Sequence, residues 1–209
     1  SCGAKHVYAI ERDQRCISAA QDISAAAPGR LSIIEDDAMS IDYTKLGTAP
    51  KKIVANLPYN IATPLLLKWL EDLSQIESMT LMFQKEVAER IVAHPGNKTY
   101  GRLSVIAQWL CDAHMDFSVS PKAFTPPPKV TSAIITLIPR TEPLMNISRK
   151  SLETVTATAF GQRRKMLRAS LKPLNLDLAS LGIEPTARAE DIDVLSFCKL
   201  AQAYEKTQE

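Results

Sequence analysis

The segment Asn56-Leu57-Pro58-Tyr59 combines residue types that could prepare an aromatic amine for chemistry, and it directly follows an expected strand over 52–55 whose last three residues are apolar. The exocyclic amine of a base such as adenine is a poor nucleophile, because its lone pair is delocalised into the ring. The side-chain oxygen of Asn56 and the carbonyl of Leu57 could accept its hydrogens and draw the nitrogen toward tetrahedral geometry. Pro58 restricts Leu57 to an extended conformation, and Tyr59 could stack on the base, which contributes about 1–3 kcal/mol. The alternative is a strand that ends in an ordinary turn.

Acidic residues follow two earlier apolar runs. Glu11 follows residues 7–10, and Asp37, which precedes Ala38, follows residues 31–34. In a parallel sheet the carboxyl ends of the strands meet at one edge, where an acid can accept hydrogen bonds from ribose hydroxyl groups. An acid at this place is also commonly just exposed to solvent, so the position alone leaves its role open.

Apolar runs alternate with helical patterns through the first 140 residues, which favours an α/β fold with parallel strands and crossover helices. We expect strands over residues 7–10, 31–34, 52–55, 78–83, 113–119 and 132–138. We expect helices over residues 13–26, 62–73, 85–93 and 102–110, and then over 148–160, 162–172, 176–181 and 192–205. The change of pattern at Pro139–Pro143 predicts two domains, an α/β domain over 1–140 and a small all-α domain over 145–209.

Positive charge is concentrated in the second of these regions. Residues 149–172 contain seven basic residues and one acidic residue, a net charge of +6 in a chain whose total is +2. Arg164, Arg168 and Lys172 are spaced four apart and would share one face of a helix. Such a face could bind phosphate groups, or it could simply be solvated.

Several multi-residue motifs, in this order, resemble those of the ribosomal RNA adenine dimethyltransferases: Asn56–Tyr59, Gln84–Val87, Tyr100–Ser104, Phe124–Val130 and Phe160–Lys165. The similarity covers essentially the whole chain and is greatest to bacterial members that act on the small ribosomal subunit. It implies a Rossmann-like methyltransferase sheet with a small all-α C-terminal domain, and S-adenosylmethionine as the methyl donor. The implied activity is dimethylation of adjacent adenines near the 3′ end of small-subunit ribosomal RNA, linked to ribosome assembly.

The resemblance also implies roles for individual residues. Phe124 and Tyr59 would enclose the target base, which must be single-stranded or flipped out of a helix. Glu11 would bind the cofactor's ribose, Asp37–Ala38 would recognise its adenine, and Asn56 would serve both ligands. The residues implied in binding the small subunit and its RNA are Arg163, Arg164, Lys165, Arg168 and Lys172.

Family members begin with a first strand and a glycine-rich turn that approaches the cofactor. The seven glycines of this chain form no Gly-x-Gly. The resemblance therefore predicts an N-terminally truncated sheet that lacks its first strand and its glycine-rich loop. Two other functions stay open: a non-catalytic RNA- or small-subunit-binding assembly factor, and a large-subunit RNA adenine methyltransferase that confers antibiotic resistance.

The remaining features indicate where such a protein would work. There is no apolar run of the roughly 18 residues that a membrane span needs, and the four cysteines are scattered without a Cys-x-x-Cys. We expect a monomer of the reducing cytoplasm, with no membrane partner and no metal site.

Overall fold

The computed structural model describes residues 3–208, and the chain forms two compact units. The first unit comprises Ser1–Pro50 and Thr63–Gln75, and the second comprises Lys51–Ala62 and Ile76–Glu209. Helix α2 (Tyr59–Trp69) runs from the second unit into the first. This division differs from the expected boundary between residues 140 and 145, which stays a prediction.

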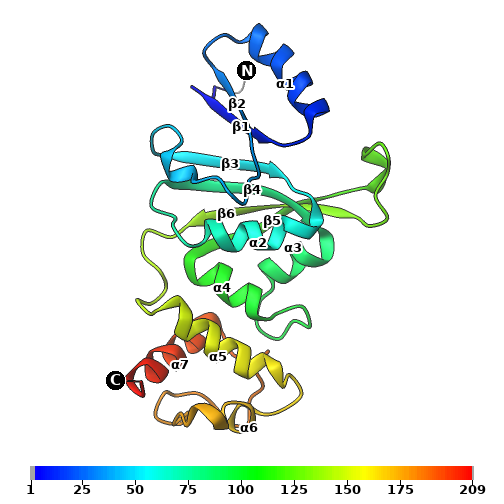
Figure 1. Cartoon of the computed structure of the whole chain (residues 1–209). Helices are drawn as coiled ribbons and strands as arrows, with labels where there is room; N and C mark the ends of the chain where they lie inside the picture. Colours follow the sequence, from blue (N-terminus) through cyan, green and yellow to red (C-terminus); the bar gives the residue numbers. More distant parts are fainter. Residues whose placement is uncertain (1–2, 209) are drawn as a thin grey trace. The chain divides into compact units, whose positions relative to one another are not determined.

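The first unit contains a two-stranded parallel sheet (Figure 1). Strand β1 (Val7–Glu11) pairs with β2 (Leu31–Glu35), so that Glu11 lies opposite Glu35. Helix α1 (Gln14–Ala26) connects them and is capped at its N-terminus by Asp13, whose carboxylate accepts the N–H of Arg15 at 2.9 Å. Hydrogen bonds from Arg15 hold the pKa of the Asp13 carboxyl at about 2.

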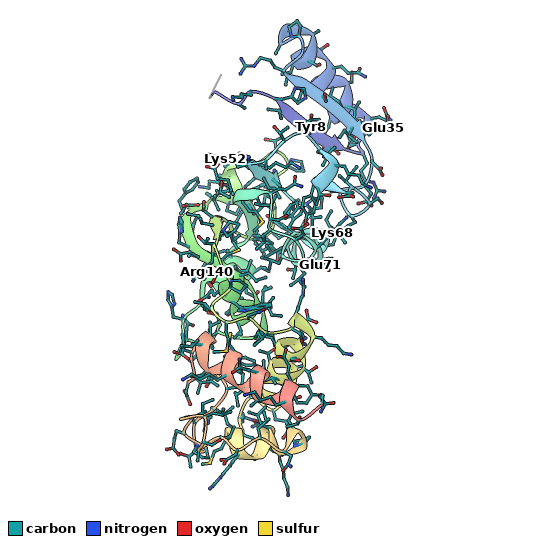
Figure 2. All side chains as sticks on the ribbon, turned by 90° about the vertical axis from the view of Figure 1, so that its left-hand side faces the viewer. Tyr8, Glu35, Lys52, Lys68, Glu71 and Arg140 are labelled. Carbon is teal, nitrogen blue, oxygen red and sulfur yellow. The ribbon has the colours of Figure 1, made fainter. Side chains whose placement is uncertain are left out.

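The loop after β2 is fastened to α2 within this first unit. Lys68, labelled in Figure 2, donates from Nζ to the carbonyl of Met39 at 2.5 Å and to that of Ile41 at 2.9 Å. The hydroxyl of Tyr43, in the 3-10 helix η1 (Tyr43–Lys45), donates to the carbonyl of Trp69 at 3.3 Å. Hydrogen bonds from side chains to main-chain carbonyls therefore attach the segment after Asp37 to α2.

The second unit contains a four-stranded sheet in the order β3-β4-β6-β5. Its strands are β3 (Lys51–Asn56), β4 (Ile76–Gln84), β5 (Cys111–Val119) and β6 (Ser132–Pro139). Strands β3 and β4 are parallel, as predicted, but β6 is antiparallel to both β4 and β5. The prediction of parallel strands was wrong here because only a loop with the 3-10 helix η2 (Pro121–Ala123) joins β5 to β6, with no crossover helix to reverse the chain.

Helices α3 (Lys85–Val92) and α4 (Arg102–Leu110) connect β4 to β5. Beyond β6 the chain is helical, with α5 (Arg149–Gly161), α6 (Leu167–Ser170), the 3-10 helix η3 (Lys172–Leu174) and α7 (Val194–Lys206). Helices α4, α5 and α7 share one apolar core, which contains Trp109, Leu152 and Phe197. No helix among residues 3–208 is long and apolar enough to cross a membrane.

The predicted helices over 162–172 and 176–181 were wrong. The chain turns after Gly161, forms an isolated bridge between Met166 and Arg188, and makes only the short helix α6. The N–H groups of Leu167 and Arg168 donate to the carbonyls of Ala187 and Pro185, so distant acceptors replace helical ones. Residues 178–182 form turns. Arg164, Arg168 and Lys172 therefore do not share one helical face.

A chain of aromatic rings lies in the C-terminal core. Tyr100 is fully buried and packs edge-on against Phe160, with ring centroids 6.0 Å apart, and Phe160 stacks on Phe197 at 5.3 Å. The buried Tyr100 hydroxyl has no hydrogen-bond partner among the described residues. Burial also raises the pKa of Tyr100.

We expect Tyr100→Phe to leave the free energy of unfolding unchanged or to raise it, because an unsatisfied buried hydroxyl costs about 1–3 kcal/mol. Tyr100→Ala, the matched control, should lower it by about 3–5 kcal/mol through loss of the ring. Urea denaturation of the three proteins measures both effects. A clear loss of stability in Tyr100→Phe would show that the hydroxyl has a partner, such as a buried water molecule.

Candidate functional site

The predicted base-binding residues lie together in the second unit. Asn56 ends β3, where it pairs with Met82 of β4, and α2 begins three residues later at Tyr59. A pocket of about 180 Å³ opens at this place. It is lined by Asn56, Leu57, Pro58, Tyr59, Met82, Phe124, Pro126 and Pro128. Pockets for drug-sized ligands measure about 300–1,000 Å³, so this smaller pocket suits one flat group.

The segment Asn56–Tyr59 is anchored by the side chain of Leu57. Leu57 is 8% exposed, whereas Asn56 is exposed and Tyr59 is half-buried. The Leu57 side chain thus holds the backbone against the core while the polar side chain of Asn56 stays accessible. This arrangement leaves Asn56 able to act as an acceptor for a ligand.

The Tyr59 hydroxyl and the Oγ of Ser132 lie 2.8 Å apart and share a hydrogen bond. Ser132 is the first residue of β6 and is 0% exposed. Ser132 was not among the residues predicted from the sequence. The available signal was a polar residue at the start of an apolar strand, two residues after the Phe124–Val130 motif.

Phe124 reaches the same pocket from the connection between β5 and β6. Helix η2 is capped by Ser120, which accepts from the N–H of Lys122 at 3.3 Å, and the N–H of Phe124 donates to the carbonyl of Pro121 at 3.2 Å. The chain bends at residues 124–126, and the Thr125–Pro126 peptide is cis.

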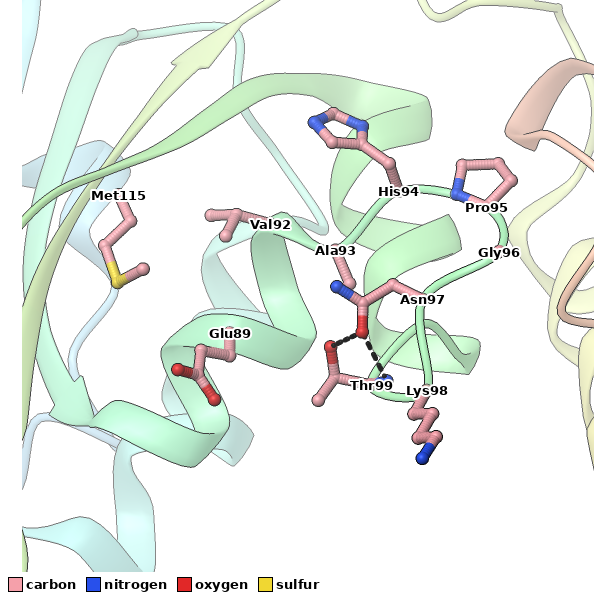
Figure 3. Close-up of a pocket in the computed structure, with 10 residues that line it drawn as sticks. All are labelled: Glu89, Val92, Ala93, His94, Pro95, Gly96, Asn97, Lys98, Thr99 and Met115. Carbon is pink, nitrogen blue, oxygen red and sulfur yellow. Dashed lines mark hydrogen bonds between the residues drawn. The ribbon is translucent and has the colours of Figure 1, made fainter.

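A larger hollow of about 810 Å³ lies elsewhere in the second unit, between α3, residues 93–99 and Met115 (Figure 3). Within it, Asn97 accepts from both the N–H and the hydroxyl of Thr99 at 3.0 Å. It contains none of the residues predicted to bind base or cofactor. Size alone would therefore not single out the predicted site.

The predicted cofactor residues Glu11, Asp37 and Ala38 belong to the first unit. Oε1 of Glu11 accepts the N–H groups of Arg12 at 2.8 Å and Asp13 at 2.9 Å, and no hydrogen bond from residues 3–208 reaches Oε2. The carboxylate is thus held by the backbone of the two following residues, and Oε2 can accept a hydrogen bond from a ligand.

Arg12 also connects the two strand ends. Its guanidinium donates to Oδ2 of Asp37 at 2.9 Å, and Oδ1 of Asp37 accepts the N–H of Met39 at 2.9 Å. Ala38 is half-buried in the turn that Asp37 begins. Because a carboxylate offers about four lone-pair sites, Asp37 can still accept a further hydrogen bond.

The predicted RNA-binding residues divide into two groups. Arg163 donates from Nε to the carboxylate of Glu190 at 2.7 Å, and from Nη2 to the carbonyls of Tyr100, at 3.2 Å, and Lys98. It therefore fastens the loop before α4 to the C-terminal region. Four members are exposed with no side-chain hydrogen bond or ion pair among residues 3–208: Arg164, Lys165, Arg168 and Lys172.

We expect Arg163→Ala to lower the free energy of unfolding by about 1–2 kcal/mol, since it removes charge-assisted hydrogen bonds from a partly exposed guanidinium. Arg164→Ala is the matched control and should change it by less than about 0.5 kcal/mol. Thermal denaturation of both variants gives the comparison. Equal stabilities would mean that the Arg163 contacts contribute nothing to folding.

Comparisons with known proteins all point to enzymes that methylate ribosomal RNA. The family model described as ribosomal RNA adenine dimethylase matches residues 2–206. A protein of Rhodospirillum rubrum named ribosomal RNA small subunit methyltransferase A is 56% identical over 204 residues, which are 96% of this chain and 71% of the relative. Its namesake in Xanthobacter autotrophicus is 55% identical over 210 residues, covering 97% of this chain and 73% of that one.

Solved structures support the same fold. A dimethyladenosine transferase from Plasmodium falciparum matches with a TM-score of 0.83 and 28% identity, over 98% of this chain and 83% of that one. The 23S rRNA methyltransferase ErmE matches with a TM-score of 0.71 and 22% identity, over 96% and 82% of the two chains, and so supports the fold alone. The predicted α/β methyltransferase class is confirmed.

Proposed function

Because this chain belongs to the ribosomal RNA adenine dimethylase family, we propose that it transfers methyl groups from S-adenosylmethionine to the N6 amine of adenine in small-subunit ribosomal RNA. Its identity of 56% to a protein named for the small subunit supports that substrate, and its likeness to a dimethyladenosine transferase supports two transfers to each base. The observation that carries the proposal is that Asn56, Tyr59 and Phe124 line the same pocket.

The pocket residues act on the target amine. Tyr59 and Phe124 hold the flipped-out base by stacking, and the small volume of the pocket suits one base. The Asn56 side-chain oxygen and the Leu57 carbonyl accept hydrogen bonds from the amine, so that its lone pair points toward the methyl donor. The amine becomes cationic on methylation and loses its proton to water, so the scheme needs no general base. Rate enhancement then comes chiefly from alignment.

The first unit supplies groups that fit the nucleoside half of the cofactor. Oε2 of Glu11 suits ribose hydroxyl groups, because Oε1 is already held by two backbone N–H groups. Asp37, steadied by Arg12, suits the cofactor's adenine amine. When bound, S-adenosylmethionine supplies a methyl group on a positively charged sulfur.

The exposed basic residues of the C-terminal region suit phosphate groups of the ribosomal RNA. They follow α5 within one short part of the chain: Arg164, Lys165, Arg168 and Lys172. Because they do not form a helical stripe, we propose that they contact phosphates as separate points. Such contacts are independent of base sequence, so they would support binding while the aromatic pocket selects the base.

Phe124→Ala should lower methyl transfer to undermethylated small subunits about 5- to 150-fold, because a base stack of about 1–3 kcal/mol is lost. Its affinity for S-adenosylmethionine should be nearly unchanged. Transfer is measured with labelled cofactor and affinity by calorimetry. Phe117→Ala is the matched control, since Phe117 is 60% exposed on β5 outside the pocket, and it should keep full activity. Full activity in Phe124→Ala would eliminate the stacking role.

Glu11→Ala should weaken S-adenosylmethionine binding about 10- to 100-fold in a calorimetric titration, because hydrogen bonds to a charged group contribute about 1.5–3 kcal/mol. Glu35→Ala is the matched control, since Glu35 pairs with Glu11 in the sheet register and should leave affinity unchanged. If the unsubstituted chain bound RNA but no cofactor, the non-catalytic RNA-binding function would replace the proposed one.

A further inference from the structure

Ser132 differs from the other buried polar side chains of the described chain in what it binds. The side chains in question are Ser104, Ser132, Ser151, Thr156 and Ser170. The hydroxyls of Ser104, Thr156 and Ser170 donate to main-chain carbonyls, and Ser151 bonds to the residue that caps α5. These contacts stabilise helices or their ends. Ser132 instead bonds to Tyr59, a side chain that lines the base pocket.

The position of Ser132 is fixed on both sides by the sheet. It pairs with Gln84 at the end of β4 and with Val119 at the end of β5, and it is 0% exposed. A hydroxyl at such a place has no access to solvent, so a rotamer that left Tyr59 would leave the hydroxyl buried and unpaired. The strand therefore holds the Oγ of Ser132 at one place.

Tyr59 gains a defined pose from this contact. It is the first residue of α2 and lies 73 residues from Ser132 in the sequence, so the hydrogen bond is a tertiary one. A half-buried tyrosine without a partner for its hydroxyl would sample several rotamers. Holding the ring in its binding pose before the base arrives reduces the ordering cost of binding and keeps the reacting amine aligned.

We propose that Ser132 is a positioning residue for methyl transfer: through its hydrogen bond to the phenol of Tyr59, it holds the ring where it stacks on the target adenine. Ser132 itself does not touch the base. This proposal rests on the proposed function, since it assigns the stacking role to Tyr59. A residue of β6 is thereby added to those that determine where the base lies in the pocket.

The test is a double-mutant cycle in the whole chain with Ser132→Ala, Tyr59→Phe and the double variant. Each single change removes one partner of the same hydrogen bond, so each should lower kcat for undermethylated small subunits about 3- to 10-fold. The double variant should be no slower than Tyr59→Phe alone. Ser118→Ala is the matched control, because Ser118 is exposed on the neighbouring strand β5, and it should keep full activity.

A fluorescence measurement separates positioning from a general loss of structure. The probe is an RNA oligonucleotide with 2-aminopurine at the target position. Its fluorescence should be quenched when it binds to the unsubstituted chain, because the base stacks on an aromatic ring. Ser132→Ala should reduce that quenching. Its RNA affinity should stay within about twofold of the unsubstituted chain, and its melting temperature should stay within a few degrees. Unchanged kcat in Ser132→Ala, or effects that multiply in the double variant, would overturn the proposal. A chain that quenches 2-aminopurine in this pattern without transferring methyl groups would refute the proposed activity and would leave Ser132 only the role of holding the Tyr59 ring against the base.

Discussion

The register of the four-stranded sheet is the constraint on which the base pocket depends. Asn56 lies opposite Met82, and Gln84 lies opposite Ser132, so the ends of β3 and β4 and the start of β6 reach the same edge. Side chains alternate between the two faces of a strand, and a slip of one residue would send each of them to the opposite face. Fully buried residues such as Ile135 make that slip costly. The core thus determines which groups can meet at the pocket.

The parts of the site that follow from local sequence could be predicted. An apolar run followed by a polar residue identified the ends of β1 and β3, and hence Glu11 and Asn56, because a parallel strand carries its ligand-facing residues at its carboxyl end. The meeting of Tyr59 with Phe124 followed only from the family resemblance, and both residues do line the pocket. Their roles toward a base and a cofactor stay predictions.

The parts that depend on distant partners could not be predicted. Ser132 gains its significance from a residue 73 positions earlier, and Arg163 from Glu190 and from carbonyls more than 60 positions away. The expected helix over 162–172 was wrong for the same reason, since main-chain acceptors from residues 185–187 replaced helical ones. Helix periodicity describes which residues can share a face, but it contains no information about competing acceptors.

The hydrogen bond between Tyr59 and Ser132 holds the tyrosine by an atom that lies on the axis about which its ring turns. The phenol oxygen is on the line that runs from Cβ through the ring, so a tether at its tip fixes where the ring lies but opposes rotation about that line only weakly. A half-turn exchanges the two edges of the ring and presents an equivalent face. The tilt of the ring plane is therefore left to the other groups that surround the ring. The hydrogen bond and the packing around the ring thus restrain different degrees of freedom of Tyr59.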